Sequence, residues 1–285
     1  MIEASRQAGT LLLVGHSHSF DAPIVRARAL ISEGSFGSVR MIHALNYTDF
    51  LYRPRRPEEL DTKQGGGVVF SQGAHQVDIV RLLGGGKVRS LRAQTGAWDS
   101  TRPTEGAYSA LLTFEGGAFA TLTYSGYAHY DSDELCEWIG ELGHRRDPST
   151  YGSARTALRK VATADQEAAL KNRRAYGAAS EPDRKPDAYN QFGMVLVSCD
   201  RADLRPLATG VMVYADERAW LEALPAPEIE RAEVIDELYG AVVERRAPIH
   251  DGAWAMATLE VCLGILESSH NGREIQLHHQ VEAQR

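Results

Sequence analysis

The sequence has few cysteines, no long apolar run and no excess of positive charge, and each of these absences excludes a class of protein. Its 285 residues include three cysteines, none of them close to another along the chain. A disulfide framework or a zinc knuckle needs paired cysteines, so neither is predicted, and a reducing, cytoplasmic location is expected. The longest apolar runs, such as residues 11–15, are far shorter than the ~20 residues of a membrane-spanning helix, and no signal-peptide pattern is found.

The charge balance argues against nucleic acid as a partner. Lysine and arginine total 31 against 38 for aspartate and glutamate, which gives a net charge of -7 at pH 7. Proteins bind a polyanion by neutralising its phosphates with basic residues, and this chain has the opposite balance. With 43% hydrophobic and 24% charged residues, the composition is that of an ordinary globular protein. We therefore expect neither nucleic acid nor membrane as a partner.

The first 36 residues have the pattern of a helix, a strand and a second helix. Residues 1–9 have the character of a helix that Gly9 ends, and residues 11–15 form a short apolar run typical of a buried parallel strand. Apolar residues then recur at helical spacing within residues 21–34. We interpret residues 1–36 as the last part of an α/β layer.

From residue 39 onward the pattern changes to alternation of apolar and polar residues, which predicts strands. Alternating segments span residues 39–47, 88–98, 107–114, 118–127, 192–199 and 207–214. Helices are predicted at residues 75–85, 227–246 and 251–272, the last with Asp251 as its N-cap. The predicted fold class is therefore α/β (α+β), with a large, mainly antiparallel, open-faced sheet and helices on one face. Residues 144–190 are charged and poor in apolar residues, which indicates a mobile insertion or flap with at most one helix.

The segment GGGVVFSQGAHQVD, residues 65–78, is the strongest candidate for a chemical site. Three successive glycines allow a ligand to approach the backbone closely, and a helix that begins near Gly73 would place His75 in its first turn. The positive end of a helix favours the neutral imidazole, which is the form that accepts a proton as a general base. The alternative is a glycine-rich loop beside a histidine that only packs or caps. The residues alone leave both interpretations open.

These segments, in this order, resemble the Gfo/Idh/MocA oxidoreductases, the group of glucose-fructose oxidoreductase and inositol dehydrogenase. The resemblance is carried by the apolar run that ends at Gly15, the turn HSHSFDAP, the pattern GGG-x5-G-x-H-x2-D at residues 65–78, and the helix at residues 251–272. Within that group, the segments YRPRRPEELDTKQGGG, FSQGAHQVDIVRLLGGG and TYSGYAHY are most similar to the dihydrodiol dehydrogenases of phthalate degradation.

The resemblance implies an NAD(P)-dependent oxidoreductase that transfers hydride between a nicotinamide cofactor and a polar cyclic hydroxyl substrate. A carboxylated cis-dihydrodiol, such as a dihydroxy-dihydrophthalate, fits the narrower similarity. Residues 1–36 would be the residual C-terminal part of a dinucleotide-binding Rossmann domain, that is, the last elements of its α/β layer. Residues 37–285 would form a substrate-binding and dimerisation domain with the flap at about 144–190. A homo-oligomer, a dimer or tetramer formed through the open sheet, is expected.

The resemblance also assigns the catalytic and cofactor positions. The family pattern D-x-G-x-H gives the histidine position to His75 and the aspartate position to Ser71, which could still bond a substrate hydroxyl. The turn with His16 and His18 would lie beside the nicotinamide, and Gly66 would contact the cofactor. Two alternating histidines also suit a metal, but no third or fourth ligand is near, so no metal is predicted.

Three arginines before the glycines, Arg53, Arg55 and Arg56, could bind substrate carboxylates in a bidentate manner. A solvated loop between prolines is the alternative. Tyr127 and His129 alternate with Tyr124 along a predicted strand, so one face of it could line a pocket, or could simply pack against helices or a dimer partner.

The pyrophosphate fingerprint G-x-G-x-x-G and a Glu-Lys-Pro are both missing from the sequence. The cofactor is therefore expected to be NAD or NADP, with its phosphate-binding loop not present in this chain. An alternative function follows: a non-catalytic truncated fragment, or a binding and dimerisation subunit of such an oxidoreductase.

Overall fold

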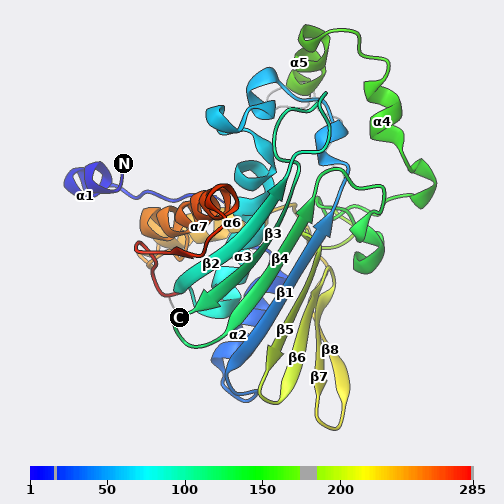
Figure 1. The fold of residues 1–285 in the computed structure, drawn as a ribbon. Coiled ribbons are helices and arrows are strands. Elements are labelled where there is room, and N and C mark those ends of the chain that lie inside the picture. Colours follow the sequence, from blue (N-terminus) through cyan, green and yellow to red (C-terminus); the bar gives the residue numbers. More distant parts are fainter. Residues whose placement is uncertain (16–17, 174–184, 284–285) are drawn as a thin grey trace.

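The protein, described by a computed structural model over residues 1–15, 18–173 and 185–283, is built on one large sheet with helices on one of its faces (Figure 1). Nine strands are hydrogen-bonded in the order β8-β7-β6-β5-β1-β4-β3-β2-β9. The strands are β1 (Val39–Tyr47), β2 (Val88–Gly96), β3 (Ala107–Phe114), β4 (Phe119–Ser125), β5 (Met194–Cys199), β6 (Ala202–Leu207), β7 (Gly210–Ala215), β8 (Ala219–Ala223) and β9 (Ile275–Gln276). The helices are α1 (Ile2–Ala8), α2 (Ala22–Ser32), α3 (Ala74–Gly84), α4 (Ser153–Leu158), α5 (Ala164–Asn172), α6 (Ala232–Val242) and α7 (Gly252–Asn271).

The sheet is antiparallel except at its centre, where β1 pairs in parallel with β4. Alternation along each strand places one set of side chains under the helices. On β1, Ile42 and Ala44 are buried on that side, and on β3 Leu112 has no exposed surface. The opposite set faces away from the helices and includes Leu111 and Phe119, each more than 40% exposed. The predicted fold class, an open-faced and mainly antiparallel sheet with helices on one face, is confirmed.

Most of the predicted elements are present with small shifts of their ends. The turn between β3 and β4 contains Gly117 at a φ of 87°, as its sequence suggests. The side chain of Asp251 accepts a hydrogen bond from the backbone of Trp254 at 2.8 Å, and Gly272 ends α7 in the left-handed conformation. These boundaries were predictable because capping residues and glycines act locally.

Three predictions about elements are wrong. Residues 11–15 form no strand of the sheet, since only Leu13 makes an isolated bridge, to Asp251. The strands β6 and β8 were missed, because Pro206 interrupts the first and the second is only five residues long. The segment 144–190 contains two short helices, α4 and α5, where at most one was expected. Its predicted mobility stays a prediction.

The helix that carries His75 is tied to the rest of the protein by a buried polar network around Asp78. Asp78 has no exposed surface and accepts hydrogen bonds from Trp254 Nε1 at 2.7 Å and Thr258 Oγ1 at 2.6 Å, both on α7. The hydroxyl of Ser19 also donates to it. One turn further along α3, the guanidinium of Arg81 lies 3.9 Å above the Trp254 ring and donates to Thr258 at 2.7 Å.

Arg81 is the cation that compensates the buried Asp78 charge, at 4.0 Å. Burial lowers the pKa of Arg81 to about 10, so the guanidinium stays charged at neutral pH. It also donates to the backbone carbonyls of Gly86 and Trp254, which tie α3 to α7 and to the loop before β2. A buried ion pair of this kind costs most when only one partner is removed.

We expect Arg81→Ala to lower the free energy of unfolding by about 3–5 kcal/mol, because the buried Asp78 would lose the guanidinium that lies 4.0 Å from it. The exposed Arg89, eight residues further on, is the matched control, and Arg89→Ala should change stability by no more than about 0.5 kcal/mol. Urea unfolding followed by circular dichroism measures both. Equal losses for the two variants would contradict the proposed importance of the Asp78 network.

Candidate active site

A large cavity lies beyond the end of β1, between the segment that follows this strand and the helices α4 and α5. Its volume is about 990 Å³. The segment after β1 contributes Thr48, Asp49 and Arg53, and the π-helical turn before α3, Val69–Gly73, contributes Gln72. The turn at residues 140–144 contributes Glu141. The helices of the predicted flap close one wall with mostly apolar side chains, namely Ala154, Ala157, Leu158 and Leu170.

The charged side chains of the cavity favour an anion. Among the described residues that line it, five are arginine or lysine and three are aspartate or glutamate. The cations are Arg53, Arg55, Arg146, Lys171 and Arg173, and the carboxylates are Asp49, Asp133 and Glu141. The lining side chains thus carry a formal excess of two positive charges, which favours a negatively charged ligand, while Asp131 and Glu59, just outside the lining, pair with Arg146 and Lys171. This balance is opposite in sign to the net charge of the whole chain.

Two histidines, His18 and His75, contact each other beside Glu141, which lines the cavity. Their ring centroids are 5.1 Å apart with the rings nearly perpendicular, and the ring of Phe192 contacts both, at 4.8 and 5.2 Å. His18 is completely buried in the loop before α2, whereas His75 is partly buried on α3. His75 is not among the residues that line the cavity. It lies one helical turn from Gln72, which does.

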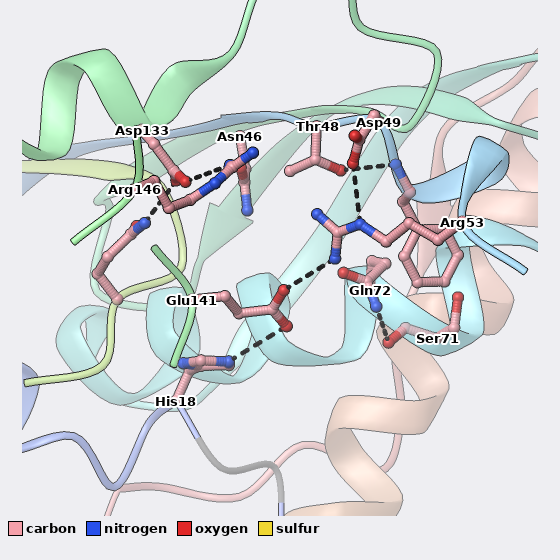
Figure 2. Close-up of polar contacts among 12 residues, drawn as sticks. His18, Asn46, Thr48, Asp49, Arg53, Ser71, Gln72, Asp133, Glu141 and Arg146 are labelled. Atoms are coloured by element: carbon pink, nitrogen blue, oxygen red, sulfur yellow. Dashed lines mark hydrogen bonds and ion pairs between the residues drawn. The ribbon is translucent and has the colours of Figure 1, made fainter. Parts of the chain in front are cut away.

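A chain of alternating charges links this histidine pair to the cavity, as Figure 2 shows. His18 Nε2 lies 3.7 Å from Glu141 Oε1, and the other oxygen of Glu141 accepts from Arg53 Nη1 at 3.4 Å. Arg53 in turn donates from Nε to Asp49 at 2.9 Å. On its other side, His18 Nδ1 bonds Asp21 at 3.0 Å. The two carboxylates therefore flank His18, and two carboxylates flank Arg53.

This arrangement keeps His18 positively charged at neutral pH. Burial alone would lower the pKa of His18, but the charges of Asp21 and Glu141 and their bonds outweigh it and raise the pKa to about 9. Burial alone would likewise raise the pKa of Glu141. The neighbouring cations, His18 first and then Arg53, lower it to about 2 instead. Glu141 is therefore an anion throughout the physiological pH range.

A second ion-paired group forms another wall of the cavity. Arg146 donates to Asp133 at 2.6 Å (Figure 2) and to Asp131 at 2.8 Å, and Asp133 also accepts from Gln191 at 2.7 Å. Asn46, at the end of β1, accepts from the buried Ser132 at 3.0 Å. These contacts fix the segment 131–146 against β1 and thereby position the turn that carries Glu141.

The helix around His75 differs from the prediction in one respect that matters for its chemistry. His75 does lie at the start of α3, but a π-helical turn, Val69–Gly73, continues directly into that helix. The amide groups of the first turn of α3 are therefore not the free end of a helix. The argument that a helix dipole favours neutral His75 is wrong, because that effect acts only within the first turn of a helical segment.

The glycines and Ser71 are occupied by local packing. A side chain on the buried Gly66 would meet the backbone of Glu58 and Glu59 within 2.7 Å. Gly67 has a φ of 85° and lies against the carboxylate of Glu105. The hydroxyl of Ser71 donates to the carbonyl oxygen of Gly67. The roles proposed for Gly66 at the cofactor and for Ser71 in catalysis stay predictions.

Of the three predicted substrate arginines, Arg53 and Arg55 line the cavity, and the side chain of Arg53 is the more exposed of these two. Arg55 is 6% exposed, lies 3.5 Å from the centre of the Phe50 ring and donates to the Phe50 carbonyl at 2.9 Å, although it still borders the cavity. Burial lowers the pKa of Arg55 to about 10. Arg56 lies outside the cavity and donates to Asn172 at the end of α5, at 2.8 Å. It attaches the flap.

Tyr127 and His129 do not share a strand with Tyr124, since β4 ends at Ser125. Tyr127 is 7% exposed, and its hydroxyl oxygen accepts a hydrogen bond from the backbone amide of Trp98 at 3.0 Å. Its side chain therefore packs inside the protein. His129 is exposed and borders a separate, smaller hollow. The predicted alternation of these side chains along one strand is therefore wrong, and the substrate-binding role of Tyr127 and His129 stays a prediction. His16 lies outside the described residues.

Sequence reasoning missed Glu141, Asp49 and Gln72, although each lines the cavity. Gly140 and Gly143 mark a turn around Glu141, and that local signal was available. Nothing in the sequence places this turn beside His18, more than a hundred residues earlier. Within the described part of the chain, no group of three or more histidine, cysteine or acidic side chains could hold a metal ion.

Known proteins are similar to this chain in sequence and in fold. The model of the GFO/IDH/MocA C-terminal domain matches residues 24–145. The chain is 47% identical over 270 residues to 1-carboxy-3-chloro-3,4-dihydroxycyclo hexa-1,5-diene dehydrogenase of Comamonas testosteroni. The aligned region covers 94% of this chain and 68% of that protein.

Solved structures share the fold. A Bordetella bronchiseptica RB50 protein superposes with a TM-score of 0.88 at 44% identity, over 97% of this chain and 72% of that one. The WlbA dehydrogenase from Bordetella pertussis, in complex with NADH and UDP-GlcNAcA, superposes with a TM-score of 0.57. At 17% identity, over 97% of this chain and 66% of that one, it shares the fold alone.

The raised pKa of His18 makes a testable prediction about stability. A histidine whose pKa rises from 6.5 to about 9 on folding stabilises the protein fully below pH 6.5, and this contribution is lost as the pH rises through 9. The free energy of unfolding should therefore fall between pH 6.5 and 9 by up to about 1.4 kcal/mol per pH unit. His18→Gln should remove most of this slope, whereas the exposed His278→Gln should keep it. Urea unfolding at several pH values measures the slope, and an unchanged slope in His18→Gln would contradict the assignment.

Proposed function

The chain belongs to the Gfo/Idh/MocA family of oxidoreductases, and on that basis we propose that it oxidises a polar cyclic diol that carries a carboxylate, a carboxylated cis-dihydrodiol. The observation that carries this proposal is the cavity of about 990 Å³, whose lining has two more cations than carboxylates and includes Glu141, the carboxylate that lies 3.7 Å from His18 of the histidine pair. A ring with a carboxylate at one end and a diol at the other matches both features. The name of the Comamonas testosteroni relative describes a compound of this class.

Arg53 is the arginine best placed to attract the substrate carboxylate. It borders the cavity, and it is held by Asp49 and Glu141 in a fixed orientation. Lys171 and Arg173, at the end of α5, add positive charge from the flap side. Cations fixed by their own carboxylate partners lose little freedom when an anion binds, so they orient the substrate at low entropic cost.

His75 is the proposed general base. When the diol is oxidised, His75 accepts the proton of one hydroxyl group as hydride leaves the carbon that carries it. A nicotinamide cofactor, when bound, accepts that hydride. Loss of the hydroxyl proton and the hydride leaves a carbonyl carbon, and for a cyclohexadiene diol the product then becomes an aromatic diol. The gain of aromaticity drives the reaction toward oxidation.

The described residues fit the nicotinamide cofactor only in part. The paired histidines and Phe192 form a compact group at the reacting end, but the sequence has no glycine fingerprint for a pyrophosphate, and Gly66 packs against its own chain. We therefore assign no contact with the cofactor phosphates to these residues. None of them distinguishes NAD from NADP. Calorimetric titration with NAD⁺ and NADP⁺ tests the alternative of a non-catalytic subunit, which micromolar binding would overturn.

The remaining organisation is also part of the proposal. Residues 1–36 would complete a dinucleotide-binding domain, and residues 37–285 would form the substrate domain. A cytoplasmic location is supported by three free cysteines, Cys136, Cys199 and Cys262. No described helix is long and apolar enough to cross a membrane.

The open face of the sheet is the proposed surface for a second copy of the chain. On the side away from the helices, four large apolar side chains are each 42 to 45% exposed, namely Leu111, Phe119, Tyr214 and Leu221. They come from four strands, and their neighbours across the strands, such as Met41 beside Phe119, continue the surface. A broad apolar face of this kind is uncommon on a monomer.

We expect His75→Ala to lower kcat on a carboxylated cis-dihydrodiol by about 10²–10⁴-fold, the contribution typical of a general base. His270→Ala, which changes an exposed histidine of α7 outside the cavity, is the matched control and should keep the wild-type rate. Steady-state measurement of cofactor reduction gives both values. If His75→Ala retained most of the activity, His75 would not be the base.

Light scattering tests the proposed dimer. The wild-type chain at micromolar concentration should have at least twice the mass of one chain, and Leu111→Asp with Phe119→Asp should give the monomer mass. Val25→Asp changes a residue of similar exposure on α2 and should leave the mass of the assembly unchanged. A monomeric wild type would overturn the assignment of this face.

A further inference from the structure

Among the described carboxylates that line the cavity, Glu141 is the one that contacts both His18 and the arginine proposed to attract the substrate. One oxygen lies 3.7 Å from His18 Nε2, and the other accepts from Arg53 at 3.4 Å (Figure 2). The charge of His75 also acts on Glu141, which places this carboxylate within electrostatic reach of the proposed base. No predicted role accounts for it.

The backbone fixes Glu141 at the tip of a tight turn. The amide of Gly143 donates to the carbonyl of Gly140 at 2.9 Å, and the amide of Gly140 donates to the carbonyl of His144 at 2.8 Å. Gly143 has a φ of 77° and lies against the carbonyl of Ala188, so no other residue fits there without strain. A turn held by these bonds presents Glu141 in one position.

The backbone just before this turn is strained, which is a further sign that its position matters. Glu137 and Trp138 both have left-handed φ angles, 59° and 58°. Such conformations cost of order 1–3 kcal/mol each for residues other than glycine and persist only where the surroundings impose them. Here Trp138 donates its amide to Asp133 at 2.8 Å and accepts at its carbonyl from Arg146 at 2.7 Å.

We propose that Glu141 is a positioning residue for the reaction: its carboxylate holds the His18 ring edge-on against His75 and stabilises the positive charge that His75 gains with the substrate proton. The role rests on the proposed function. It also explains why Ser71, whose hydroxyl is engaged by Gly67, can stand where the family pattern has an aspartate. The carboxylate is supplied from another element.

The groups that face Glu141 decide the sign of its effect. They are His18 and Asp21 from the loop at α2, Arg53 after β1, His75 on α3 and Tyr124 on β4. Removing the negative charge of Glu141 leaves Asp21 as the carboxylate bonded to His18 and Asp49 as the carboxylate bonded to Arg53. Protonation of either histidine then becomes less favourable. For a base that must be unprotonated to act, the acidic limb of the pH profile moves to lower pH.

The first test is independent of any substrate. Histidine ring titrations by nuclear magnetic resonance should show the pKa of His18 lower by at least about one unit in Glu141→Gln, as expected for loss of an adjacent opposite charge. Glu134→Gln, an exposed glutamate of the same segment, should leave it unchanged. A His18 titration unaffected by Glu141→Gln would overturn the proposal.

The second test uses the reaction. Glu141→Gln should lower kcat at least tenfold without raising KM, because Arg53 keeps its charge and loses a competing anion, and the acidic limb of kcat/KM should move down. Ser71→Asp, added to Glu141→Gln, should restore most of the lost rate. A wild-type kcat and pH profile in Glu141→Gln, or a double variant no faster than the single one, would overturn the role. If the wild-type enzyme failed to oxidise the diol, the proposed function would be wrong, and the His18 titration would still decide the role of Glu141.

Discussion

The position of both histidines depends on one buried carboxylate, Asp78. It lies one turn beyond His75 on α3 and accepts a hydrogen bond from Ser19, the neighbour of His18. Its other bonds, from Trp254 and Thr258, attach α3 to the long C-terminal helix α7. A buried charge needs partners in fixed places, so the network selects one relative position of two helices and a loop. Segments that are distant in sequence thereby bring His18 and His75 together.

Another histidine, His250, extends the network around Asp78 toward α6. His250 bonds Ser19 at 2.8 Å through Nε2 and Glu237 at 2.9 Å through Nδ1, and its ring stacks on Phe20 at 3.6 Å. Serine, histidine and carboxylate in this order also form hydrolytic triads, but here Ser19 has no exposed surface and its hydroxyl is committed to Asp78. The arrangement is therefore structural: it positions the loop that carries His18.

The sequence was informative where structure is local and uninformative where it is not. Alternation predicted the central strands, and Asp251 with Gly272 predicted both ends of α7, because strand faces and helix caps depend on near neighbours. His75 could be singled out from its motif. Its helix continues from a π-helical turn, which no periodicity reveals, and Arg55 and Tyr127 pack inward although arginine and tyrosine patterns favour a pocket. Glu141 could not be found, since only the tertiary fold joins its turn to His18.

The cavity has to satisfy two electrostatic demands that oppose each other. A carboxylate substrate requires positive potential, whereas a histidine that accepts a proton requires a nearby negative charge to stabilise the product cation. If the cationic and the anionic side chains lay in separate parts of the cavity, Glu141 or Arg53 would lack an oppositely charged neighbour. The ion pair of Glu141 with Arg53 meets both demands. Arg53 supplies positive potential for the carboxylate of the substrate, and Glu141 supplies negative potential for the histidine. When no substrate is bound, the two charges neutralise each other. The proposed function therefore implies one orientation for the diol, with its carboxylate toward the arginine of the pair and its hydroxyl groups toward the histidines.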